Sequence, residues 1–161
     1  MLDSTAASTL SLSPQAYASI VSYCQSQLPN EACGLLASSV TSPSSTLSDN
    51  VPLAVDVALP IANVHPEPRH AFTFDPQAWI NAYYFMMRTN QSLIGYFHSH
   101  PTTAPIPSLS DAAGLPQGTD PVMLIVSFAA TQPQLSAYRL LSSAQTWFTL
   151  TVAITPEAPI K

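Results

Sequence analysis

Residues 92–101 read Ser-Leu-Ile-Gly-Tyr-Phe-His-Ser-His-Pro, and this stretch decides how the rest of the chain is interpreted. The apolar and aromatic run before the first histidine is typical of a buried strand, and the proline after the second histidine indicates where that strand ends. Because side chains alternate between the two faces of a strand, His98 and His100 point the same way with their imidazoles adjacent. Such a pair suits zinc, which in catalytic sites takes three protein ligands and leaves one position for water.

Asp111 is the candidate third ligand, because the proline-rich loop from Thr102 to Pro107 can turn the chain back over the histidines. Each feature also has a purely structural alternative. A strand can carry two histidines for packing, and residues 108–111 have the form of a helix capping box with Ser108 at the N-cap. The joint pattern favours the metal site, and a capped helix start would itself fix where Asp111 points. We therefore predict one zinc ion per chain, bound by His98, His100 and Asp111.

The order His-x-His, seven residues, Ser, two residues, Asp resembles the signature of the JAMM metalloproteases, also called the MPN+ or Mov34/PAD-1 family. Members also carry an upstream glutamate in a segment like Glu-x-Cys-Gly-Leu-Leu, and residues 31–36 here read Glu-Ala-Cys-Gly-Leu-Leu. The resemblance spans residues 9–153 and includes Asn63 and the segment Phe-Thr-Phe-Asp-Pro at 72–76. It departs at Ala37, where many relatives have glycine, and in the serine-rich stretch 38–49.

The resemblance implies catalytic roles for Glu31 as general base and for Ser108 as a hydrogen-bond donor to the oxyanion. The sequence also favours Glu31, because Glu67 lies between prolines and Glu157 lies near the C-terminus, whereas Glu31 is flanked by apolar residues. Partial burial there would raise its pKa usefully. The alternative role of Ser108 is the helix cap. Cys33 is interpreted as an inert buried thiol rather than a nucleophile.

The length and composition fit one domain. The chain has 161 residues, of which 47% are hydrophobic, and a net charge of −5 with only four Lys and Arg. Four scattered cations cannot form a basic patch, which argues against nucleic acid or an anionic membrane as partner. No apolar run is long enough to cross a membrane and no signal peptide is evident, so we predict a cytoplasmic protein with reduced cysteines.

Hydrophobic periodicity predicts strands at residues 9–12, 32–37, 93–100, 122–128, 136–141 and 147–154, and one bent strand or two short ones within 51–64. One helix is predicted from Ser13-Pro14 through Leu28 before Pro29. A second is predicted after Asp75-Pro76, with a buried face of Ala78, Trp79, Ala82, Phe85 and Met86. His65 and His70 are interpreted as loop histidines rather than ligands, and residues 38–50 as a solvated loop.

This pattern predicts an α+β or three-layer α-β-α fold with a mixed central sheet and flanking helices. The resemblance implies the cytidine-deaminase-like arrangement of the JAMM (MPN) domain. We assign residues 9–154 to the domain and predict a flexible tail at 1–8 and a C-terminal tail at 155–161.

The resemblance also implies hydrolysis of an amide or isopeptide bond after the C-terminal tail of a ubiquitin-like protein. Only about ten residues separate Asp111 from the strand at Val122, too few for the inserts with which large deubiquitinases grip ubiquitin. The resemblance to small bacterial relatives therefore implies a small β-grasp sulfur carrier of the ThiS/MoaD type as substrate, with release of an amino acid or peptide adduct from its Gly-Gly tail. The alternatives are a deubiquitinase-like or general JAMM endopeptidase and a noncatalytic MPN interaction module.

Overall fold

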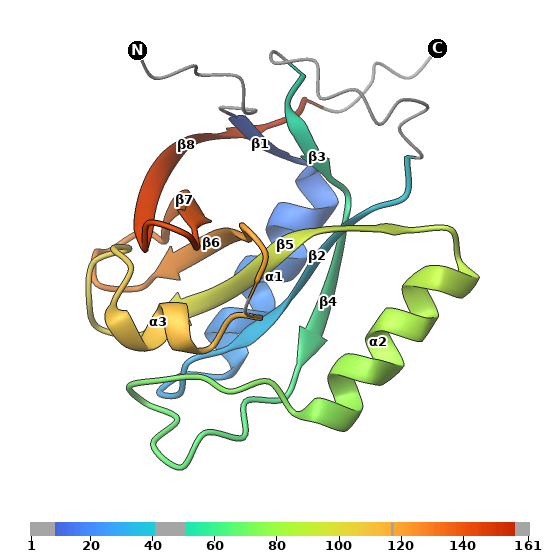
Figure 1. Cartoon of the computed structure of the whole chain (residues 1–161). Helices are drawn as coiled ribbons and strands as arrows, with labels where there is room; N and C mark the ends of the chain where they lie inside the picture. The colour runs from blue at the N-terminus through green and yellow to red at the C-terminus, as the bar shows by residue number, and fades with distance from the viewer. Residues whose placement is uncertain (1–8, 41–50, 117, 157–161) are drawn as a thin grey trace.

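The computed structural model describes residues 9–40, 51–116 and 118–156, which form a single mixed sheet of eight strands with helices on both faces (Figure 1). The strand order is β3-β1-β8-β7-β6-β5-β2-β4. The strands are β1 (Thr9–Leu12), β2 (Cys33–Ser38), β3 (Leu53–Val55), β4 (Val57–Ile61), β5 (Ser92–His100), β6 (Val122–Ser127), β7 (Gln134–Leu141) and β8 (Thr146–Ile154). The helices are α1 (Pro14–Ser26), α2 (Pro76–Arg88) and α3 (Leu109–Ala113).

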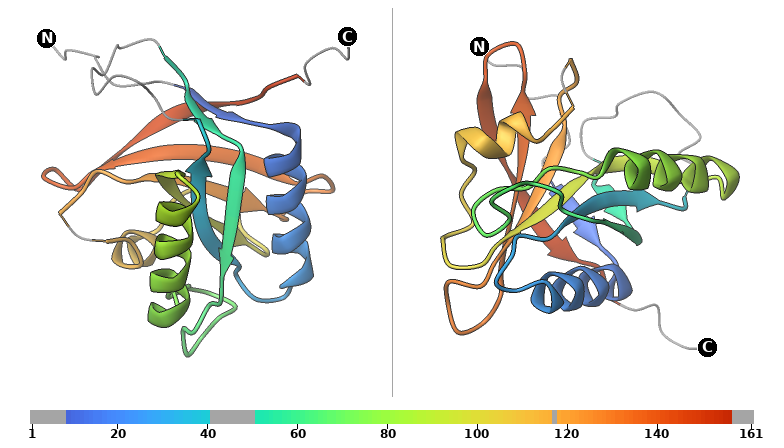
Figure 2. Two further views of the ribbon diagram at one scale, coloured as in Figure 1. Left: turned by 90° about the vertical axis from the view of Figure 1, so that its right-hand side faces the viewer. Right: turned by 90° about the horizontal axis from the view of Figure 1, so that it is seen from below.

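The sheet separates two hydrophobic clusters, which confirms the predicted three-layer arrangement with flanking helices. Along β5, Phe97 packs into the cluster that also holds α1, whereas its neighbour Tyr96 packs into the cluster that holds α2. Neighbouring Leu36 and Leu35 on β2 divide in the same way. Figure 2 shows α1 and α2 on opposite sides of the sheet. The alternation places His98 and His100, two and four residues after Tyr96, on the α2 side.

The two longer helices begin where the sequence predicts and differ in detail further along. The Ser13 hydroxyl and the Asp75 carboxylate accept hydrogen bonds from the first turns of α1 and α2. The expectation that α1 continues through Leu28 is wrong: it ends at Ser26, and Leu28 is 39% exposed. The residue before a proline is disfavoured in the helical region, so the helix ends before it reaches Pro29.

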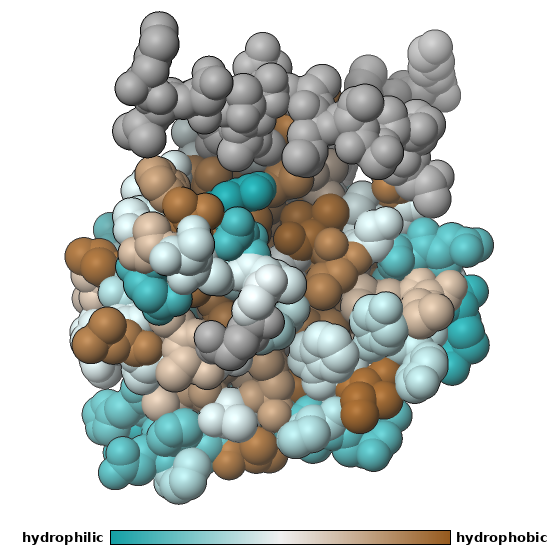
Figure 3. Space-filling view, in the orientation of Figure 1, coloured by the Kyte–Doolittle hydropathy of each residue, from teal (hydrophilic) through white to brown (hydrophobic). Residues whose placement is uncertain are grey.

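The predicted inner face of α2 is correct for four residues and wrong for Phe85. Met86 is buried and Ala78, Trp79 and Ala82 pack beside it, but Phe85 is 42% exposed because it lies at the margin of this stripe. Large exposed apolar side chains also lie at Ile80, Tyr83, Tyr84 and Met87. Figure 3 shows hydrophobic patches interspersed with hydrophilic ones over one face of the molecule.

The connection between β5 and β6 brings α3 to the end of β5. The two strands are adjacent and parallel, so the chain must cross over one face of the sheet to return to the start of β6. Ala112 and Leu115 pack in the cluster that contains α2, which shows that the crossover covers the face carrying the two histidines. This topology returns the segment after the proline-rich loop to His98 and His100.

Other expectations are answered in part. The 51–64 region forms two short strands, β3 and β4, and Asn63 after them makes an isolated bridge with Phe74. The predicted N-terminal tail, most of the serine-rich loop, and residues 157–161 lie outside the described residues. Among the residues that the structure describes, no helix is long and apolar enough to span a membrane.

Candidate metal centre

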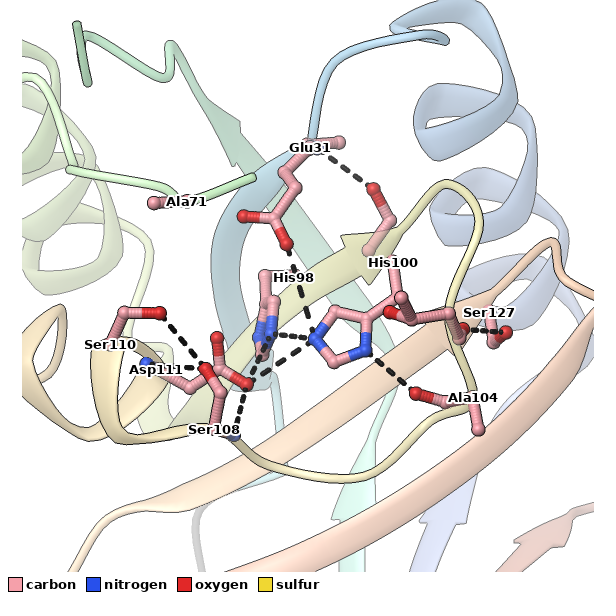
Figure 4. Close-up of polar contacts among 12 residues, drawn as sticks. Glu31, Ala71, His98, His100, Ala104, Ser108, Ser110, Asp111 and Ser127 are labelled. Atoms are coloured by element: carbon pink, nitrogen blue, oxygen red, sulfur yellow. Dashed lines mark hydrogen bonds and ion pairs between the residues drawn. The ribbon is translucent and has the colours of Figure 1, made fainter. Parts of the chain in front are cut away.

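Three atoms that could bind a metal ion, from the end of β5 and the start of α3, form a nearly equilateral triangle (Figure 4). His98 Nε2 lies 3.0 Å from His100 Nε2, and Asp111 Oδ2 lies 3.2 Å from the first and 3.3 Å from the second. A zinc ion about 2.05 Å from each ligand in tetrahedral geometry would separate them by about 3.3 Å. The triangle has the size that zinc requires, and all three residues are buried.

The far nitrogen of each imidazole also has a partner, which orients the ring. His100 Nδ1 lies 2.8 Å from the Ala104 carbonyl oxygen, and His98 Nδ1 lies 3.0 Å from Met123 Sδ. A proton on each Nδ1 leaves the Nε2 lone pair free for a metal. The Phe72 ring stacks on His98 at a centroid distance of 4.6 Å and holds that ring from a second side.

Strand register brings Glu31 to the same place. β2 and β5 are antiparallel with Cys33 opposite His98, so the same register extended past the strand end sets Glu31 opposite His100. Ala32 reinforces this, since its N–H donates to Ser99 Oγ at 2.8 Å and its carbonyl accepts from the Ser99 N–H at 3.0 Å. Glu31 Oε1 lies 4.0 Å from His100 Nε2. This distance is longer than those from His100 Nε2 to His98 Nε2 and to Asp111 Oδ2.

Burial and charge shift the two carboxyl groups in opposite directions. Burial, followed by the negative charge of Asp111, raises the pKa of Glu31 to about 7, and His100 offsets only part of this. Burial also acts to raise the pKa of Asp111, but the contacts with His100 and His98 outweigh it and hold the pKa well below its usual range. Asp111 is therefore ionised like a metal ligand, whereas Glu31 is poised to exchange a proton near neutral pH.

Ser108 is the N-cap residue of α3. It lines a pocket that also contains Glu31 and His100. Its hydroxyl accepts from the Asp111 N–H at 3.2 Å, and the Asp111 carboxylate accepts from the Ser108 N–H at 2.9 Å. This reciprocal pair is the predicted capping box. The cap aims Asp111 Oδ2 at the histidines, so the structural interpretation of residues 108–111 and the metal interpretation hold together.

Comparison with known proteins agrees with this geometry. Prok-JAB, the prokaryotic homologs of the JAB domain, matches residues 13–141. The chain belongs to this family. The expected class of enzyme, a JAMM metallopeptidase, is thereby confirmed. The chain is 32% identical over 108 residues to the desampylase of Haloferax volcanii, covering 65% of this chain and 70% of that protein. It is 39% identical over 57 residues to a probable TtuB-protein conjugate cleaving protease of Thermus thermophilus, covering 35% of this chain and 38% of that one.

Solved structures support the fold. A protein of Desulfitobacterium hafniense solved in solution has a TM-score of 0.76 at 25% identity, covering 92% of this chain and 94% of that one. A JAB1/MPN domain protein of Archaeoglobus fulgidus has a TM-score of 0.55 at 15% identity, covering 92% and 99%. A structure described as a JAMM metalloprotease-like zinc site in the proteasome and signalosome has a TM-score of 0.52 at 14% identity, with the same coverage. The predicted JAMM (MPN) fold is confirmed.

The remaining sulfur and imidazole candidates do not join the ligand cluster. Burial raises the pKa of Cys33 to about 12, and the negative charge of Glu31 adds to this, so its thiol is protonated at neutral pH as expected. Among the described residues, the cluster of metal-binding side chains consists of Glu31, His98, His100 and Asp111. His65 accepts a hydrogen bond from the Glu67 N–H within its own loop.

Sequence reasoning missed the residues that hold the loop after His100. The carbonyl oxygens of three consecutive residues of this loop are each bound: Thr103 by the Ser127 hydroxyl at 2.5 Å, Ala104 by His100, and Pro105 by the Tyr138 hydroxyl at 2.6 Å. Ser127 and Tyr138 lie on β6 and β7, where they carry no local signal of such a role. The contacts fix one wall of the pocket.

Sequence reasoning also missed that the loop at 65–71 forms the opposite wall. Glu31 donates its N–H to the Pro68 carbonyl at 2.7 Å. Asn63 Nδ2 donates to the carbonyls of Glu31 and Ala71, both at 3.0 Å. These contacts place Arg69 and His70 on the lining of a cavity of about 440 Å³ that also contains Glu31, His100 and Ser108. Asn63 belongs to the quoted family pattern, but only its four hydrogen bonds show what it does.

Proposed function

We propose that this protein is a zinc-dependent peptidase that hydrolyses an amide or isopeptide bond at the C-terminal Gly-Gly tail of a ubiquitin-like sulfur carrier of the ThiS/MoaD type. The observation that carries the proposal is the triangle of His98, His100 and Asp111 with Glu31 beside it. The names of two relatives, a desampylase and a TtuB-conjugate cleaving protease, support a small modifier protein as the substrate.

The donor set fits a zinc ion. Two imidazoles and one carboxylate are ligands that zinc prefers, and their mutual distances suit a tetrahedral ion with one open position. Glu31 Oε2 is buried and has no hydrogen-bond partner among the described residues, so this carboxylate has an unused acceptor. When bound, zinc would supply Lewis acidity and lower the pKa of a coordinated water toward roughly 7.

The side chains around the ligands can perform the remaining steps. Glu31 accepts a proton from the attacking water and returns it to the leaving amine, and a pKa near neutrality suits both transfers. Ser108 donates its hydroxyl hydrogen to the substrate carbonyl oxygen as negative charge develops there, an interaction typically worth about 3 kcal/mol. Ser108 Oγ accepts from the Asp111 N–H and lies 2.9 Å from Ser110 Oγ. Its own hydrogen is available to the substrate when the Ser110 hydroxyl is the donor of that second contact.

The expected binding mode is an extended Gly-Gly tail laid beside the metal centre, recognised through its main chain. Glycines suit such a site, because a tail without side chains can approach a buried scissile position closely. The short crossover between α3 and β6 offers no large insert for gripping a folded partner. This favours a small carrier over ubiquitin. The cytoplasm, where free thiols such as Cys24 and Cys33 stay reduced, remains the predicted location.

The test is incubation of the zinc-loaded protein with a ThiS-type carrier extended beyond Gly-Gly by one amino acid, followed by mass spectrometry of the intact carrier. The expected product has lost the added residue and ends in Gly-Gly, and a chelator stops the reaction. Glu31→Gln, loaded with the same amount of zinc, is the matched inactive control. Rapid cleavage of ubiquitin chains with no action on the carrier would favour a deubiquitinase-like enzyme. No hydrolysis of either substrate would favour a noncatalytic module.

A further inference from the structure

Arg69 is the Lys or Arg residue among the described side chains that line the pocket. It is one of only four Lys and Arg residues in a chain of net charge −5. It is exposed and lines the same cavity as Glu31 and His100. In the part of the chain that the structure describes, its guanidinium makes no ion pair. A free guanidinium facing a hydrolytic site is suited to a planar anion such as a carboxylate.

The backbone fixes the side of the site on which this arginine lies. Pro68, the residue before Arg69, accepts the hydrogen bond from the Glu31 N–H, and Asn63 joins Glu31 to Ala71 on the far side of the same short loop. Figure 4 shows Ala71 and Glu31 on one side of the histidine pair and Ser108 on the other. Arg69 therefore belongs to the Glu31 side of the pocket.

The proposed reaction assigns a substrate group to that side. The leaving amine must face Glu31, which returns the proton to it, whereas the carbonyl oxygen faces Ser108 and the metal ligands. In an amino acid released from a carrier, the α-carboxylate is separated from that amine by only one carbon atom. The carboxylate thus lies on the Glu31 side, where Arg69 is the cation that can meet it.

We propose that Arg69 forms a carboxylate subsite that selects carriers whose Gly-Gly tail ends in a single amino acid with a free α-carboxylate. His70, exposed beside it on the same lining, offers a second polar group. A lysine side chain of a conjugated protein presents its ε-amine without a nearby carboxylate and would gain nothing from Arg69. The inference rests on the proposed function and refines it, because it assigns this enzyme to adduct release rather than to removal of modifiers from proteins.

The kinetic test uses a ThiS-type carrier ending in Gly-Gly-Ala, prepared as the free acid and as the alaninamide. We expect wild type to hydrolyse the acid with a kcat/KM on the order of 10 to 100 times that of the amide, the usual advantage of a hydrogen bond to a charged group. In Arg69→Gln, kcat/KM for the acid should fall to the value for the amide, mainly through a higher KM. The kcat/KM for the amide should stay as in wild type. Arg69→Lys should retain part of the preference, and Arg88→Gln, an exposed arginine at the end of α2, should behave as wild type.

Equal hydrolysis of acid and amide by wild type would overturn the proposal. It would also be overturned if Arg69→Gln hydrolysed both substrates more slowly by the same factor, or hydrolysed both as fast as wild type does. A binding arm separates this failure from failure of the proposed function. The tripeptide Gly-Gly-Ala and its amide are titrated into zinc-loaded wild type and Arg69→Gln, and chemical shifts are followed by NMR. If no carrier is hydrolysed, the proposed function fails. Tighter binding of the acid that vanishes in Arg69→Gln would still support the subsite, and equal binding of acid and amide would still refute it.

Discussion

Replacement of Glu31 by glutamine should change how the stability of the metal-free protein depends on pH. The residue is 5% exposed, and burial with the nearby Asp111 charge raises its pKa from 4.5 to about 7. Between these two pH values the folded protein keeps a proton that the unfolded chain has released. The contribution of Glu31 therefore lowers the free energy of unfolding as pH rises through this window. Above the window, Glu31 causes no further decrease. The shift corresponds to a total of ~3 kcal/mol.

Glutamine cannot titrate, so the Glu31→Gln variant should lack this contribution. We expect the difference in unfolding free energy between variant and wild type to grow by ~3 kcal/mol in favour of the variant between pH 4.5 and pH 8. The assay is urea unfolding followed by circular dichroism at a series of pH values, in the presence of a chelator. Comparing the two proteins at each pH removes the contribution of other groups that titrate alike in both.

Addition of zinc provides the internal control. A cation beside Glu31 favours its ionised form, so the pH-dependent difference should shrink when both proteins are saturated with metal. Parallel stability curves for the two metal-free proteins from pH 4.5 to pH 8 would refute the argument. That result would mean that Glu31 is solvated or paired in a way that contradicts its burial. Loss of zinc binding in Glu31→Gln would instead identify Glu31 as a fourth ligand.

Three further perturbations test other parts of the site and the sheet. His98→Ala should bind less than one zinc ion per chain in elemental analysis. It should keep a cooperative unfolding transition, because two apolar clusters form the core without metal. Equal zinc content in variant and wild type would show that His98 is not a ligand. Ser108→Ala should lower kcat by a factor of about 10² to 10³ and the free energy of unfolding by only about 1 kcal/mol. A loss of thermal stability with unchanged kcat would mean that Ser108 acts only as the helix cap. Gly95→Ala should lower the free energy of unfolding by several times the ~1 kcal/mol of an average substitution. The reason is that the added Cβ would lie 2.5 Å from the Val122 carbonyl oxygen on β6. An unchanged melting temperature would contradict the packing between β5 and β6.

The features that the sequence predicted well depend on neighbours along the chain. The shared direction of His98 and His100 follows from the period of two along a strand, and the capping box at Ser108 follows from the spacing of two polar residues. The starts of α1 and α2 were equally local, each marked by a capping side chain followed by proline. The two errors have different places: Leu28 lies beyond the end of α1, and Phe85 lies within α2 at the margin of its buried stripe. At both places tertiary packing decides burial.

The sequence by itself determined the strand that carries the histidines, the helix start that carries Asp111 and, through its family pattern, the importance of Glu31. Only the tertiary structure decided that these groups meet. Glu31 faces His100 because β2 pairs with β5 in one antiparallel register, and Asp111 returns because β5 and β6 are parallel and need a crossover. Asn63 and Arg69 reach the site through loop contacts with Glu31 and its neighbours. Pairing partner and register depend on the packing of the whole sheet, and no local periodicity of the chain encodes them.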